Sequence, residues 1–154
     1  MKRLLLIPLV FLLTACTVET ASLLISGPQL AVTLERAKPY FWSSGWELRL
    51  VMRNDPECQR RHILKPVSAE VVKVEVYSPA RGALIFRQGK RWYVGSLKSC
   101  DLQPYNDPPE APGDLIGVFQ VKGGEFRFVD DPDFLAKTGR SGTPPDADAK
   151  PAAK

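Results

Sequence analysis

Residues 46–53, WELRLVMR, decide the fold class, because apolar and charged side chains alternate along them. A period of two places successive side chains on opposite faces of a β-strand. The stretch therefore predicts a strand with one face in the core and the other mostly in water. The inward set is expected to be Trp46, Leu48, Leu50 and Met52, and the outward set Glu47, Arg49, Val51 and Arg53.

The same signals recur along most of the chain. Residues 72–77 alternate in the same way, and short glycine-containing segments separate further apolar runs, which is typical of β-hairpins. No segment shows a long apolar pattern at helical spacing, although Asp131 followed by Pro132 favours a short helix through Lys137. The sequence thus predicts an all-β fold, a small antiparallel β-sandwich or barrel of about eight strands with at most one short helix. The other expected strands are residues 23–26, 29–36, 83–87, 92–97, 115–121 and 125–129.

Two segments fall outside the strand pattern. Residues 101–113 contain four prolines and are expected to form a long surface loop. Residues 139–154 contain no large apolar side chain and cannot bury enough surface to offset the entropy of ordering. We therefore expect a single β domain at residues 23–138, followed by a disordered tail at 139–154.

The amino terminus, MKRLLLIPLVFLLTAC, has the order of a secretory signal peptide. Lys2 and Arg3 precede a largely apolar run at residues 4–13, which is too short for the roughly 20 residues that a membrane-spanning helix needs. The residues that follow complete the sequence Leu13-Thr14-Ala15-Cys16, which resembles the lipobox of bacterial lipoproteins. The resemblance covers only the first sixteen residues, and the rest of the chain resembles no family.

The lipobox resemblance implies a mature protein that begins at Cys16. In this family the signal is cut before the cysteine, here between Ala15 and Cys16, and the cysteine carries a covalent lipid. Residues 1–15 would be the signal peptide and residues 16–22 a lipidated tether, and Thr17 in place of aspartate implies the periplasmic side of the bacterial outer membrane. The alternatives are an uncleaved amphiphilic amino terminus or a plain signal peptide with a chance cysteine.

With Cys16 assigned to lipid, Cys58 and Cys100 remain as an even pair. In an exported protein such a pair favours a disulfide. A metal site is the competing interpretation, because Cys58 and His62 are four residues apart. A zinc site needs four ligands, or three and a water, and His62 is the only histidine. We therefore expect a disulfide and no metal.

Charge is unevenly distributed along the chain, whose formal net charge is +4. Residues 36–98 contain thirteen Lys and Arg against five Asp and Glu, whereas residues 99–154 contain six against ten. Such asymmetry indicates either an anionic partner or two segments that lie together and neutralise each other, and we favour the second. No nucleic-acid motif is present, and none is expected in a lipid-anchored envelope protein.

The sequence contains no arrangement that points to catalysis. A nucleophile and base pair would have to use His62, and no nucleophile elbow or glycine-rich phosphate loop is present. The aspartates at 130, 131 and 133 do not match a calcium loop. We therefore expect no enzyme activity, no catalytic residue and no cofactor other than the lipid on Cys16.

Binding is the remaining class of function. Aromatic and cationic side chains are the types that form interface hot spots and stack on sugars or headgroups. One hypothesis is an accessory lipoprotein that docks a protein partner in the envelope, and the other is a module that binds an anionic glycan or lipid. A concave pocket would favour the second and a flat apolar patch the first. Trp46 and Trp92 are expected in the core, so the candidate binding residues are Trp42, Arg60, Arg61, Lys90 and Arg91.

Overall fold

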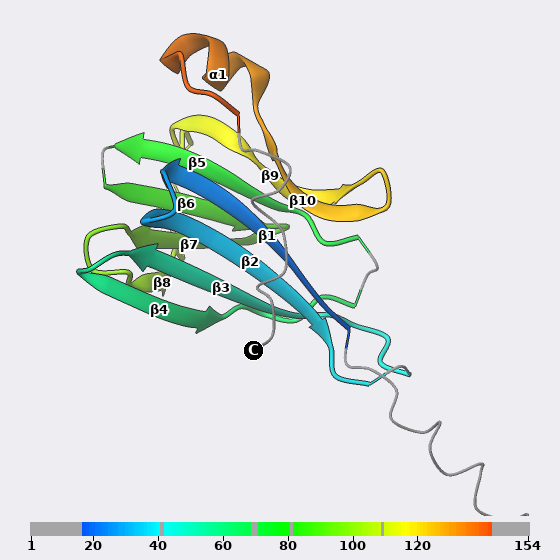
Figure 1. The fold of residues 1–154 in the computed structure, drawn as a ribbon. Helices are drawn as coiled ribbons and strands as arrows, with labels where there is room; N and C mark the ends of the chain where they lie inside the picture. The colour runs from blue at the N-terminus through cyan, green and yellow to red at the C-terminus, as the bar shows by residue number, and fades with distance from the viewer. Residues whose placement is uncertain (1–16, 41, 69–70, 81, 109, 143–154) are drawn as a thin grey trace, which may run out of the picture.

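Two antiparallel sheets pack face to face in the computed structural model (Figure 1). The structure describes residues 17–142 except 41, 69–70, 81 and 109. The first sheet has the order β1-β2-β3-β4, which follows the chain, so each neighbouring pair is a hairpin. Its strands are β1 (Thr17–Ser26), β2 (Leu30–Lys38), β3 (Glu47–Asn54) and β4 (Cys58–Ile63).

The second sheet has the order β10-β9-β5-β6-β7-β8. Its strands are β5 (Val74–Ala80), β6 (Ala83–Gln88), β7 (Arg91–Ser96), β8 (Leu102–Pro104), β9 (Asp114–Lys122) and β10 (Glu125–Asp130). The core lies between the sheets, where alternate side chains from both are fully buried, as the period of two requires. Its largest members are Phe86, Phe119, Leu23, Leu34, Leu48, Leu50 and Met52.

The sandwich is closed along both sides. On one side β1 lies beside β10. On the other, a disulfide joins Cys58 on β4 to Cys100, just before β8, with the Cα atoms 5.9 Å apart. The disulfide is therefore a covalent link between the two sheets, and the predicted pairing of these cysteines is confirmed.

The predicted all-β sandwich is confirmed, with ten strands among the described residues in place of eight. The two strands that the pattern missed are β4 and β8. Their side chains are mostly exposed, so neither strand shows the buried alternating face by which the other strands were predicted. β8 lies inside residues 101–113, so that segment is a loop with a short strand in it.

The expected tether at residues 16–22 is wrong for its described part, because β1 already begins at Thr17. Residues 17–24 pair in register with β2, starting with Thr17 opposite Lys38. Ala21 is fully buried, and Glu19 pairs with Arg36 of β2. The sandwich therefore starts at the residue that follows Cys16, and no flexible spacer separates them.

Five parts of the chain meet at one end of the sandwich, on the right in Figure 1. They are the start of β1, the β2–β3 and β4–β5 loops, and the β6–β7 and β9–β10 turns. Trp46 at the end of the β2–β3 loop forms a bridge with Val67 in the β4–β5 loop, which holds these two loops together. Because this end contains Thr17, we call it the N-terminal end of the sandwich.

The opposite end carries the predicted helix, α1 (Pro132–Thr138). The Asp131 carboxylate accepts hydrogen bonds from the backbone N–H groups of Asp133 and Phe134, which confirms it as the N-cap. Within the part of the chain that the structure describes, no helix is long and apolar enough to cross a membrane. Residues 1–16, with the lipobox and Cys16, and residues 143–154 of the predicted tail lie outside the described residues.

Candidate functional site

Lys90 and Arg91 lie at the β6–β7 turn, where they line a hollow at the N-terminal end. The turn forms because Gly89 adopts a positive φ of 60° between two strands that pair up to Gln88 and Arg91. The hollow has a volume of about 400 Å³ and is also lined by Lys65 and Tyr105. Three exposed cations from two separate loops therefore converge on one concave surface.

A second, larger hollow of about 800 Å³ shares Lys90 and Arg91. It extends over the outer face of β5 and β6, where Lys73 and Arg87 both form ion pairs with Glu75, at 3.0 and 3.4 Å. Burial raises the pKa of Glu75, but the hydrogen bond from Tyr77 and the two cations outweigh it, so the pKa lies below its ordinary value of 4.5. Glu75 is thus ionised and neutralises part of this hollow.

The cations of the smaller hollow are not neutralised in this way. Among the described residues, no carboxylate forms an ion pair with Lys65, Lys90 or Arg91, and the same holds for Lys122 in the β9–β10 turn. These four side chains are exposed and lie at the N-terminal end. This end therefore presents positive charge that is available to an anionic group.

Trp42 projects from the same end, in the β2–β3 loop. Its side chain is 68% exposed and stacks on the Tyr40 ring, with the ring centroids 5.0 Å apart. Trp46 is buried in the core, as expected. The expected core position of Trp92 is wrong, because its side chain is half-buried beside Tyr77 and does not belong to the core. Trp42 lines neither of these two hollows.

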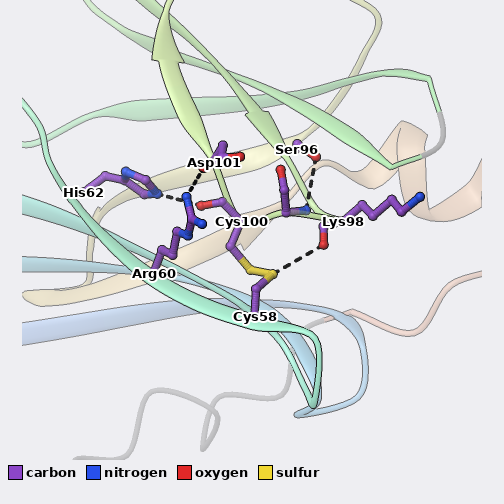
Figure 2. Close-up of polar contacts among 8 residues, drawn as sticks. Cys58, Arg60, His62, Ser96, Lys98, Cys100 and Asp101 are labelled. Carbon is purple, nitrogen blue, oxygen red and sulfur yellow. Dashed lines mark hydrogen bonds and ion pairs between the residues drawn. A yellow bond between two sulfur atoms is a disulfide. The ribbon is translucent and has the colours of Figure 1, made fainter.

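Arg60 and Arg61 belong to a different part of the surface, the edge strand β4. Arg60 forms an ion pair with Asp101, and Arg61 with Glu35 at 3.3 Å. Figure 2 shows Arg60 pointing toward Asp101 across the gap between β4 and the segment before β8. The structure therefore separates the predicted binding set into neutralised residues on β4 and a cationic pair at the β6–β7 turn.

His62 and Cys58 do not form the alternative metal pair. The Cys58 sulfur is bonded to Cys100, and the His62 Nε2 atom lies 2.7 Å from the Cys100 carbonyl oxygen (Figure 2). In the described part of the chain, no group of three or more histidine, cysteine or acidic side chains is arranged to hold a metal ion. These residues serve to join β4 to the second sheet.

The charge asymmetry is only partly explained by neutralisation. Arg60 and Asp101 do pair across the basic and acidic segments, as the favoured interpretation requires. Most other ion pairs between described residues stay within one segment, including Arg49 with Glu47 and Lys137 with Asp114. The favoured interpretation therefore does not account for the cations at the β6–β7 turn.

Lys65 and Lys122 are site residues that sequence reasoning missed. Each follows or ends a strand, and neither stands in a basic cluster in the sequence. Recognition of β4 as a strand would have placed Lys65 at the same end as Lys90, because antiparallel strands alternate in direction.

No family model, no curated protein and no solved structure matches this chain.

Proposed function

We propose that the protein is a bacterial envelope lipoprotein, anchored by a lipid on Cys16, that works as a non-catalytic accessory protein on the periplasmic side of the outer membrane. The proposal rests on the sequence Leu13-Thr14-Ala15-Cys16, which resembles a lipobox, and is supported by the start of β1 at Thr17, directly after it. One residue spans at most about 3.6 Å, so a lipid on Cys16 would hold the N-terminal end of the sandwich against the bilayer.

The anchoring is tested with Cys16→Ala in the full-length chain. The variant is expected to remain an unprocessed precursor and to lose labelling by a radioactive fatty acid. A matched control is the double variant Cys58→Ala with Cys100→Ala, which removes two cysteines and is expected to keep the label. Normal processing and labelling of Cys16→Ala would contradict the proposal.

The first candidate for the accessory role is a protein partner in the envelope, reached by the sandwich surface that faces away from the membrane. The second candidate is an anionic glycan or lipid. The hollow lined by Lys65, Lys90 and Arg91 favours the second, because it is concave and its cations are unpaired among the described residues.

The two candidates are separated by a photoreactive side chain placed at position 90 or, as a control, at position 98. Lys98 is exposed and lies at the opposite end, in the loop after β7. Irradiation of intact cells followed by mass spectrometry identifies what is captured. A glycan or lipid on position 90 alone supports the second candidate, and a defined protein on position 98 supports the first.

A further inference from the structure

The large apolar side chains that remain exposed are gathered at the N-terminal end. All six of those found among the described residues sit in its loops or within the first or last two positions of the strands that reach it. A monomeric protein usually scatters such residues singly over its surface. The six are Val18, Tyr40, Trp42, Ile63, Val71 and Val121, exposed by 36% to 83%.

The same end carries four exposed cations that form no ion pair with a carboxylate of the described residues, Lys65, Lys90, Arg91 and Lys122. Lys73 lies there too, but Glu75 neutralises it. The opposite end is different in character, because Asp55, Glu57, Asp131 and Asp133 are grouped around its turns and helix. Both ends carry charges of either sign, but the exposed aromatic and large apolar side chains of the described residues occur only at the N-terminal end, together with these four cations.

Apolar and aromatic side chains surrounded by Lys and Arg are the combination that binds a lipid surface. Tryptophan and tyrosine place their rings at the headgroup level, and each cation near an anionic leaflet contributes roughly 1 kcal/mol, or about a fivefold change in binding. A soluble anionic ligand would account for the cations but not for the six exposed apolar side chains. A bilayer accounts for both.

We infer that the N-terminal end of the sandwich docks on the anionic phospholipid bilayer to which the protein is anchored. Tyr40 and Trp42 enter the headgroup layer, and Lys65, Lys90 and Arg91 bind lipid phosphates. The inference rests on the proposed anchoring, which brings this end to the bilayer. The lipid chain supplies membrane attachment, and the docking surface fixes the orientation of the domain on the membrane.

The test uses the mature lipidated protein, purified in detergent and reconstituted into vesicles with brominated acyl chains, which quench tryptophan fluorescence. One set of vesicles is pure phosphatidylcholine, and the other contains phosphatidylglycerol. The contribution of Trp42 is the difference between the wild type and Trp42→Phe. We expect stronger quenching of Trp42 in the anionic vesicles and a loss of this excess in 0.5 M NaCl, because salt screens the cations.

Variants that remove one positive charge test whether the charge-dependent quenching of Trp42 comes from the N-terminal end. Lys90→Gln is expected to lower the ratio of docked to undocked protein by about fivefold. Lys98→Gln removes the same charge from the opposite end and is expected to leave the ratio unchanged. Equal effects of the two variants, or Trp42 quenching that does not depend on lipid charge, would overturn the docking surface.

Flotation of the vesicles distinguishes a failure of the docking from a failure of the anchoring. Protein that floats with the phosphatidylcholine vesicles is anchored without help from lipid charge. If Trp42 of this anchored protein stays unquenched in the vesicles that contain phosphatidylglycerol, the docking alone is contradicted. Protein that fails to float with either set of vesicles contradicts both proposals. If Lys90→Gln instead weakens binding of soluble dextran sulfate while Trp42 stays unquenched, the hollow serves a glycan and the docking surface is rejected.

Discussion

Arg36 on β2 and Glu19 on β1 form an ion pair of 2.6 Å at the N-terminal end of the sandwich. The Arg36 side chain is almost fully buried, and its guanidinium lies 4.3 Å from the centre of the Trp46 ring and 4.7 Å from that of Phe126. Because Phe126 belongs to β10, Arg36 connects the first sheet to the second. A buried charge needs such a partner, since an unpaired one is strongly unfavourable inside a protein.

We expect Glu19→Gln to lower the free energy of unfolding by about 1–3 kcal/mol, because Arg36 would stay buried without a countercharge. Urea denaturation of the variant and wild type measures the difference. In an Arg36→Met background the same change is expected to cost much less.

The control is Glu47→Gln, which breaks the exposed ion pair with Arg49 and is expected to cost less than about 1 kcal/mol. Equal losses in the free energy of unfolding from Glu19→Gln and Glu47→Gln would show that burial of Arg36 does not strengthen the effect of losing its partner.

Removing the disulfide is expected to destabilise the protein by about 4 kcal/mol, because the bond closes a loop with a sequence separation of 42. The measurement compares the unfolding of the wild type, with and without reductant, and of the double variant Cys58→Ala with Cys100→Ala. Alkylation of Cys58 and Cys100 in denaturant without reductant would show that the bond is absent.

Truncation to alanine is expected to reduce stability strongly at Trp46 and only slightly at Trp42. Trp46→Ala should cost about 3–5 kcal/mol of stability, because a buried indole is lost from the core. Trp42→Ala should change stability by less than about 0.5 kcal/mol, because most of its side chain is exposed. Thermal unfolding of the two variants is the measurement, and comparable losses would contradict the placement of Trp42.

Glu75 is expected to make stability depend on pH in the acidic range. Its lowered pKa means that its contribution is fully present above the ordinary value of 4.5 and is lost as the pH falls through the folded-state pKa. The difference in unfolding free energy between the wild type and Glu75→Gln should therefore shrink from pH 6 to pH 3. Glu57→Gln, on an exposed turn, is the control. A difference in unfolding free energy that grows toward low pH would contradict a lowered pKa of Glu75.

The strands that sequence predicted are those with a buried alternating face. β3 follows the pattern of residues 46–53, with Leu48, Leu50 and Met52 fully buried. β4 lacks that signal because most of its side chains are in water, and it is held by pairing with β3 and by the disulfide. β1 began earlier than predicted because its first core residue is the small Ala21, whose burial leaves little trace in an apolar pattern.

The candidate site could be predicted only in part, because its members come from distant loops. Charge alone placed Arg60 and Arg61 with Lys90 and Arg91. The two pairs differ in whether a carboxylate lies beside their cations. Asp101 and Glu35 come close to Arg60 and Arg61 on β4 only when the sheets are folded. The gathering of exposed apolar residues at one end is likewise a property of strand direction and register, which local sequence does not specify.

A lipid on Cys16 that holds this sandwich on the membrane would be detected in the mass of the amino-terminal tryptic peptide. Arg36 is the first Lys or Arg after Cys16, so trypsin should release residues 16–36. From protein extracted from bacterial membranes, we expect a peptide that begins at Cys16 and carries the added mass of acyl chains. A peptide with an unmodified Cys16, or one that retains residues from the first fifteen, would contradict it.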